Sequence, residues 1–155
     1  MRIEEIMAKA VHVCEPDDRL DRVAQLMWEH DIGCLPVCLP GGGSSRRAVG
    51  MITDRDVCMS AMFKGRSLSD LRVSDAMARK LLACHPGDSL EEAEKIMRDG
   101  RIRRLPVVNE TGCLLGMISL ADLAREAARE SAMPMKSITE TEVGDTLAAI
   151  CAPGH

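Results

Sequence analysis

A short motif that places a hydroxyl three residues before a carboxylate occurs twice in this chain of 155 residues. The copies are residues 50–56 (GMITDRD) and residues 116–122 (GMISLAD). The apolar residues before Thr53 and Ser119 predict the end of a strand, and the residues after them predict the start of a helix. A hydroxyl at that position, together with the first backbone N–H groups of a helix, can donate hydrogen bonds to a phosphate.

The carboxylates of the two motifs, Asp56 and Asp122, lie one turn into the predicted helices. A carboxylate has two acceptor oxygens and can bind both hydroxyls of a ribose. Phosphate donors beside a diol acceptor therefore indicate a nucleotide site. The alternative is an ordinary helix start, in which Thr53 and Ser119 are N-caps and the acids complement the helix dipole. The motif occurs twice, each time after the same glycine and a predicted hairpin. This repetition favours a ligand site over an ordinary helix start.

Arginines accompany the motifs unequally. Arg103 and Arg104 precede the second Leu-Pro-Val stretch and can clamp a phosphate by forked hydrogen bonds, whereas Gly33 and Cys34 occupy these positions in the first copy. Arg55 is a further phosphate-binding candidate, present in the first motif only. The alternative for these arginines is a solvated basic surface. We expect the two sites to differ in affinity or in the charge of the ligand.

The motifs belong to a longer internal repeat. Residues 3–38 align with residues 73–108 at an offset of 70 positions, and the offset falls to 66 at the motifs. The additional residues of the first copy fall within residues 40–47, and the second copy has the shorter turn at residues 109–112. Both stretches have turn composition, so the insertion is predicted at a hairpin tip that leaves the flanking strands in register.

Each copy predicts the order β-α-β-β-α and hence an α+β fold with a three-stranded sheet. The predicted strands are residues 10–14, 34–39 and 48–53, then 81–84, 105–108 and 113–119. Predicted N-caps Asp18 and Asp88 start the first helix of each copy, and the second helices cover residues 55–64 and 120–128. Two copies related by a pseudo-two-fold axis, with their small sheets packed face to face, would cover the exposed sheet faces.

The repeat divides the chain into three predicted regions. Residues 1–66 form the first repeat, residues 67–130 form the second, and residues 131–155 form a C-terminal tail. The tail contains a possible short helix at residues 141–152.

Composition argues against several classes of function. Trp28 and Phe63 are the only aromatic residues and the net charge is −4, so the stacking and phosphate contacts that nucleic-acid binding requires are missing. The seven cysteines are scattered without a C-x-x-C pair, which favours buried thiols in a reducing cytoplasm over a metal site. No apolar stretch has the length of a membrane span. The histidines form no nucleophile–base pair, so we expect no enzyme.

Together these features resemble the CBS (cystathionine-β-synthase) domain family over residues 1 to 130. The resemblance rests on the two motifs, on Leu-Pro-Val at residues 35–37 and 105–107, and on Met-Ala at residues 7–8 and 77–78. It implies a module with two clefts between the sheets that binds AMP, ADP, ATP or S-adenosylmethionine. It also implies a disc-like homodimer of two such modules.

The resemblance also implies roles for individual residues. The motif acids would hold ribose, the motif hydroxyls would touch ribose or phosphate, and the arginines would meet phosphate. Apolar residues around positions 10–11 and 81–82 would wall the base. The predicted ligand-binding set is Thr53, Arg55, Asp56, Arg103, Arg104, Ser119, Asp122, Val11 and Leu82.

We therefore predict a regulatory nucleotide-binding module with no obligatory cofactor. Ligand binding would change its conformation, and an unknown effector protein would read that change. Three alternatives remain open at this stage. They are a ligand-free dimerising interaction scaffold, a redox or metal sensor that uses the cysteines, and a nucleotide hydrolase.

Overall fold

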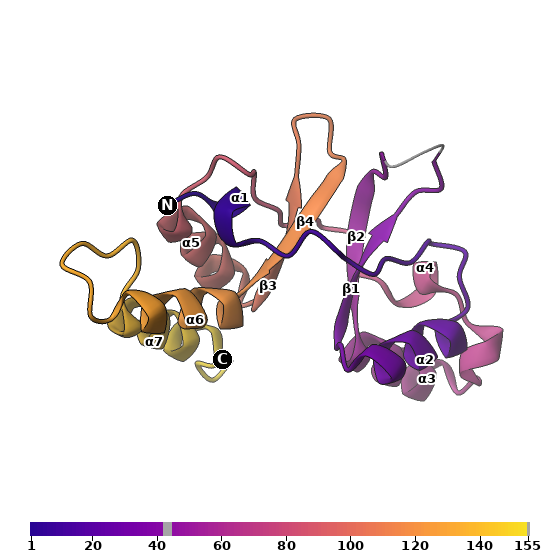
Figure 1. Ribbon diagram of the computed structural model, residues 1–155. Helices are drawn as coiled ribbons and strands as arrows, with labels where there is room; N and C mark the ends of the chain where they lie inside the picture. The colour runs from indigo at the N-terminus through magenta and orange to yellow at the C-terminus, as the bar shows by residue number, and fades with distance from the viewer. Residues whose placement is uncertain (42–44, 155) are drawn as a thin grey trace. The chain divides into compact units, whose positions relative to one another are not determined.

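The computed structural model describes residues 1–41 and 45–154 (Figure 1). The chain forms two compact units that do not coincide with the two sequence repeats. The first-repeat unit contains His12–Leu81 and Gly112–Leu114, and the second-repeat unit contains Met1–Val11, Leu82–Thr111 and the chain from Leu115 on. The hairpin tip predicted at residues 40–47 includes residues 42–44, which lie outside the described residues.

The first-repeat unit combines a two-stranded antiparallel sheet with helices. Its elements are α2 (Leu20–His30), β1 (Cys34–Cys38), β2 (Ala48–Thr53), α3 (Asp54–Lys64), the 3-10 turn η1 (Leu68–Asp70) and α4 (Val73–Ala76). In the sheet, Leu35 of β1 lies opposite Ile52 of β2. Both side chains are buried in a core with Leu20 and Val23 of α2. The apolar residues of α2 at 3- and 4-residue spacing thus face the sheet, whereas Trp28 is exposed.

The second-repeat unit has the same plan and one additional helix. Its elements are α1 (Ile3–Ile6), α5 (Leu90–Gly100), β3 (Arg104–Val108), β4 (Leu114–Ser119), α6 (Leu120–Glu130) and α7 (Glu140–Ile150). The strands β3 and β4 pair in one sheet. α7 confirms the helix predicted in the C-terminal tail. Within the described part of the chain, no helix is both long enough and apolar enough to cross a membrane.

The α+β prediction is confirmed, but the third strand of each sheet is not formed. The stretches predicted as strands at residues 10–14 and 81–84 contribute one parallel bridge each, Cys14 with Val37 and Cys84 with Val107. The backbone N–H of Cys14 donates to the carbonyl of Pro36 at 3.1 Å. The next hydrogen bond of a parallel ladder would need the N–H of Pro36, which proline lacks. Pro106 has the same effect in the second repeat.

The predicted N-caps of α2 and α5 are wrong by one residue. The carboxylates of Asp18 and Asp88 accept from the N–H groups of Glu15 and His85, at 2.8 and 2.7 Å, and so close the turn before each helix. Each helix begins one residue later than predicted. Ser89 is the N-cap of α5, because its hydroxyl accepts from the backbone at the third helical position.

The segment that opens each repeat completes the unit of the other repeat. Ala8 exchanges two backbone hydrogen bonds with Met117, at 2.8 and 2.9 Å, and Ala78 exchanges two with Met51, at 2.8 and 3.1 Å. The short helices that precede these bridges, α1 and α4, are anchored by fully buried side chains such as Val73. The Met-Ala segments are therefore structural, since each adds a bridge to the strand that carries the motif of the other repeat.

The first glycine of each motif is required by this backbone contact. A Cβ atom on Gly50 would lie 2.4 Å from the carbonyl oxygen of Ala78, and a Cβ atom on Gly116 would lie 2.6 Å from that of Ala8. Both distances are shorter than van der Waals contact, and backbone atoms in a bridge cannot yield without breaking it. These glycines serve chain packing and need no ligand to explain them.

The fold buries several of the seven thiols. Cys14 and Cys84, the residues of the two parallel bridges, are buried, and burial raises the pKa of each thiol to about 12. Cys58 and Cys151 are exposed. Because the thiolate is the reactive form, reactivity should follow this division.

Alanine at either motif glycine should destabilise the protein. We expect Gly50→Ala and Gly116→Ala each to lower the free energy of unfolding by about 1–3 kcal/mol, because the added methyl group overpacks a backbone bridge. Gly144→Ala is the matched control: it lies inside α7 with nothing within 4 Å of the added Cβ, and should stabilise by up to about 1 kcal/mol. Urea unfolding followed by circular dichroism measures all three. Equal effects at the three glycines would contradict the packing argument.

Thiol labelling should separate the cysteines. In the native protein at pH 8, a colorimetric thiol reagent should modify Cys58 and Cys151 first, and Cys14 and Cys84 only after unfolding. Peptide mapping of the labelled sites measures the order. Rapid native labelling of Cys14 or Cys84 would show that these thiols are not held in the core.

Candidate functional site

A cavity of about 300 Å³ lies within the second-repeat unit, at the junction between β4 and α6. This volume is at the lower end of the range for small-molecule sites. Three residues of the predicted ligand-binding set line it, and α6 and α7 supply the others. The lining residues are Arg103, Arg104, Ser119, Leu120, Ala121, Ala124, Val143 and Leu147.

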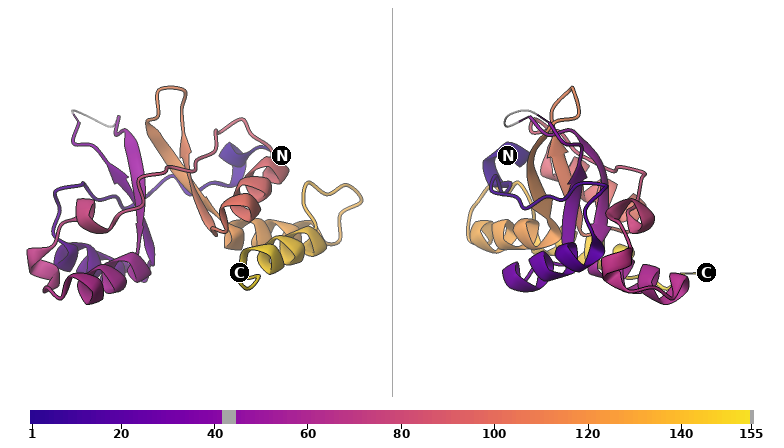
Figure 2. Two further views of the ribbon diagram at one scale, coloured as in Figure 1. Left: turned by 180° about the vertical axis from the view of Figure 1, so that it is seen from behind. Right: turned by 90° about the vertical axis from the view of Figure 1, so that its right-hand side faces the viewer.

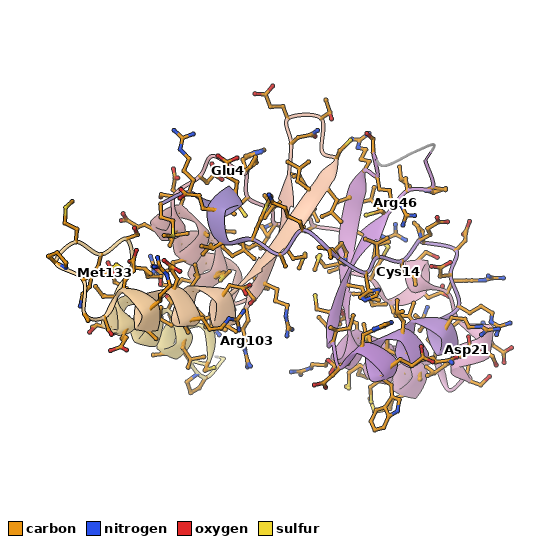
Figure 3. All side chains as sticks on the ribbon, viewed as in Figure 1. Glu4, Cys14, Asp21, Arg46, Arg103 and Met133 are labelled. Carbon is orange, nitrogen blue, oxygen red and sulfur yellow. The ribbon has the colours of Figure 1, made fainter. Side chains whose placement is uncertain are left out.

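The turn before β3 brings the two arginines to the start of α6. Arg101, in the left-handed conformation with φ 51°, ends α5 and turns the chain toward β3. The carbonyl of Arg103 then accepts from the N–H of Leu120, the first residue of α6, at 2.8 Å. In Figure 3, Arg103 lies where β3 begins, beside the start of α6. Arg103 and Arg104 therefore reach Ser119 through the tertiary structure although they are distant from it in the sequence.

The same connection forms in the first repeat without the arginines. There the carbonyl of Gly33 accepts from the N–H of Asp54 at 3.0 Å. A Cβ atom at Gly33 would lie 3.2 Å from a carboxylate oxygen of Asp54, so this turn has little room for a side chain. Arg55, one residue further along α3, is exposed. The two junctions share a backbone geometry and differ in charge.

Thr53 and Ser119 are N-caps, as the helix-start interpretation predicted, and both motifs form complete capping boxes. Asp56 N–H donates to the hydroxyl of Thr53 at 3.1 Å, and the Thr53 N–H donates back to Oδ2 of Asp56 at 2.9 Å. In the second motif these distances are 3.2 and 2.8 Å, and the Ser119 hydroxyl also donates to Oδ2 of Asp122 at 2.6 Å. The backbone N–H groups of the cap residue and of the third helical residue are thus already bonded, and that of the first helical residue donates to the carbonyl of Gly33 or Arg103. This arrangement leaves fewer phosphate donors at the helix start than the sequence suggested.

The outer oxygens of the two carboxylates differ in their surroundings. Oδ1 of Asp122 pairs with Arg125, whose side chain is 72% exposed, while the Asp122 side chain is 18% exposed. Among the described residues, Oδ1 of Asp56 has no hydrogen-bond partner. A ribose at Asp122 would have to displace the exposed Arg125, which costs little because surface ion pairs are weak.

The guanidinium groups at the cavity are available for an anion. Arg103 and Arg104 are exposed, and neither forms an ion pair within the described part of the chain. The guanidinium of Arg103 contacts Sγ of Cys151 through Nη2, at 4.0 Å. Two arginines without ion pairs are suited to a phosphate, which accepts forked hydrogen bonds from each of them.

The two residues of the predicted apolar wall do not line this cavity. Val11 is half-buried, and Leu82 packs against the C-terminal end of α5, where its Cδ1 lies 2.5 Å from the Cβ position of Gly100. Neither residue is among those that line the cavity. The apolar lining comes instead from α6 and from Val143 and Leu147 of α7. The tail showed helical periodicity in the sequence, but that signal does not reveal the surface on which the helix docks.

No metal centre is evident in the residues that the structure covers. No group of three or more His, Cys, Asp or Glu side chains within residues 1–41 and 45–154 is arranged to hold an ion.

Known proteins match both repeats of this chain. The family model described as "CBS domain" matches residues 3–61 and 73–129. The chain is 34% identical over 131 residues to CBS domain-containing protein YhcV of Bacillus subtilis, which covers 84% of this chain and 89% of that protein.

Solved structures share the fold. The crystal structure of Hypoxic Response Protein I with two coordinated zinc ions has a TM-score of 0.70 at 30% identity and covers 81% of this chain and 98% of its own. CBSX2, solved in complex with AMP, has a TM-score of 0.71 at 24% identity and covers 84% of this chain and 98% of its own. The duplicated motif, the paired hairpins and the family match over both repeats together establish that this chain belongs to the CBS domain family.

Proposed function

We propose that this protein is a regulatory module that binds an adenosine nucleotide at the β4–α6 junction and signals its occupancy to an effector protein. The observation that carries the proposal is the cavity in which Arg103, Arg104 and Ser119 converge although they come from separate elements. CBSX2, which has the same fold, was solved with AMP, and this supports an adenosine ligand here.

Each part of a nucleotide has a counterpart at or beside the cavity, although Asp122 itself is not among the residues that line it. Arg103 and Arg104 would bind the phosphate, and Asp122 would accept the ribose hydroxyls after Arg125 moves aside. The base would lie against aliphatic side chains, since both aromatic residues of the chain belong to the other unit. Two unpaired cations favour AMP, ADP or ATP over S-adenosylmethionine, which carries a positive sulfonium and no phosphate.

The first repeat would bind more weakly. Thr53 and Asp56 repeat the hydroxyl and the carboxylate, but Arg55 is the only arginine of the predicted set at that junction. We therefore propose that the second repeat holds the tighter site and that occupancy of the first requires a higher ligand concentration.

Regulation, and not catalysis, is the proposed output. A ligand that binds one conformation better than another shifts the population toward it, and a partner protein can respond to that shift. A ligand-free dimerising scaffold is the second candidate, favoured by the fact that both motifs complete their capping boxes without a ligand. A cytoplasmic location stays a prediction.

We also propose that the protein is a homodimer. Trp28 of α2 and Met62 and Phe63 of α3 are 88%, 59% and 78% exposed, and we call these three residues the α2–α3 surface. Large exposed apolar side chains of this kind mark interaction sites, and aromatic residues are enriched there. In the second-repeat unit, α7 packs against both corresponding helices, α5 and α6. The disc-like arrangement that the family resemblance implies stays a prediction.

Isothermal titration calorimetry with AMP, ATP and S-adenosylmethionine tests nucleotide binding. We expect AMP or ATP to bind, and the double variant Arg103→Ala/Arg104→Ala to weaken binding by about tenfold or more, since a charge-assisted hydrogen bond contributes about 1.5–3 kcal/mol. Arg55→Ala is the matched control, an exposed arginine beside the other motif, and should leave the tighter site unchanged. If no nucleotide binds or raises the melting temperature, the scaffold candidate replaces the sensor.

Light scattering coupled to size exclusion tests the dimer. Trp28→Glu combined with Phe63→Glu should convert a dimer into a monomer, because two charges would be buried in an apolar contact. Met135→Glu is the control, since Met135 is 86% exposed outside the α2–α3 surface. A monomeric parent protein, or a double variant that stays dimeric, would refute the proposed interface.

A further inference from the structure

α7 is firmly docked on the second-repeat unit. It packs against α5 and α6, and Figure 2 shows it, in yellow, lying beside α6. Ile138, just before the helix, is 1% exposed, and Ile150 at its end is 9% exposed. The carboxylate of Glu130 accepts from the backbone N–H groups of Ser137 and Ile138, at 2.6 and 3.3 Å, and so holds the segment that leads into α7.

A buried polar cluster sets the register of α7. The Thr146 hydroxyl donates to Oε1 of Glu94 at 2.9 Å and accepts from Nη1 of Arg98 at 2.9 Å. Thr146 is 0% exposed and Glu94 is 3% exposed, and burial raises the pKa of this carboxyl. Hydrogen bonds between buried polar groups are directional, so α7 cannot slide along α5 without leaving one of them unpaired.

This cluster is specific to the second repeat. At an offset of 70 positions, Glu94 and Arg98 align with Ala24 and Trp28 in the first repeat. Neither of those side chains can supply the same bonds to a threonine. The chain therefore has a polar docking site for α7 on one repeat and an exposed apolar surface at the equivalent place on the other.

Docking in this register brings α7 to the cavity. Val143 and Leu147, one helical turn apart on the same helix face, line the cavity together with Arg103, Arg104 and Ser119. Leu147 is 44% exposed, so a ligand would cover apolar surface there. At the end of α7, Sγ of Cys151 lies 4.0 Å from Nη2 of Arg103, and the carbonyl of Ala152 accepts from Nη1 of Arg101 at 3.4 Å.

We infer that α7 is part of the nucleotide site of the second repeat. Val143 and Leu147 form the wall against which the apolar part of the ligand rests, and the phosphate at Arg103 lies close to the C-terminal end of α7. Ligand binding is thereby coupled to the docking of the C-terminal helix. This inference rests on the proposed function and adds the specificity-determining residues that the two motifs do not contain.

The first arm of the test is calorimetry with AMP and ATP on the full chain. Leu147→Ala should weaken binding by about tenfold, the size expected when roughly a methylene or two of buried contact is lost. Leu115→Ala is the control: it is 39% exposed, in the same unit, and does not line the cavity, so it should bind like the parent protein. Circular dichroism confirms that both variants are folded.

The second arm uses the parent protein and needs no substitution. AMP at a concentration that fills the tighter second-repeat site but not the weaker first-repeat site should slow thiol labelling of Cys151 severalfold, because ligand at Arg103 covers the end of α7. Exposed Cys58 of the other unit should then react at an unchanged rate. If nucleotide binds and depends on Arg103, but Leu147→Ala and the labelling of Cys151 show no effect, the role of α7 is refuted and the proposed function stands. If no nucleotide binds the parent protein, both are refuted.

Discussion

Two backbone bridges, Ala8 with Met117 and Ala78 with Met51, are the contacts on which the rest of each unit depends. In each bridge a carbonyl oxygen lies so close to Gly116 or Gly50 that a Cβ atom on that glycine would be 2.6 or 2.4 Å from it. Because each bridge adds an opening Met-Ala segment to the motif strand of the other repeat, neither repeat builds its unit from its own residues alone. The duplicated sequence and the duplicated structure are therefore offset by one segment.

The same strands lead directly into the two candidate sites. Each ends at a hydroxyl residue that caps a helix, and the capping box holds the motif acid in place through its Oδ2 atom. The structural and the ligand-binding interpretations of Thr53 and Ser119 are compatible, because a box that uses one carboxylate oxygen leaves the other for a second partner. A helix start that is already ordered would bind ligand with little further loss of conformational entropy.

The chemistry differs where the two repeats have diverged. The second repeat has Arg103 and Arg104 at its cavity and Glu94 and Arg98 as a docking site for α7. The first repeat keeps the backbone geometry, but it presents Trp28 to solvent at the position of Arg98. The second-repeat unit therefore presents two exposed arginines beside α7, and the first-repeat unit presents an exposed apolar surface.

The sequence by itself determined the repeat, the α+β class, the five longer helices and the paired strands, because periodicity and turn composition are local properties. It also identified Arg103, Arg104 and Ser119, which the structure places around one cavity. Only the tertiary structure decided which unit receives each Met-Ala segment and which surface α7 covers, because both depend on contacts between distant residues. The third strands that were predicted but do not form show the same limit. Pro36 and Pro106 can be read from the sequence, but only the tertiary structure shows that a parallel strand beside them would need the N–H group that proline lacks.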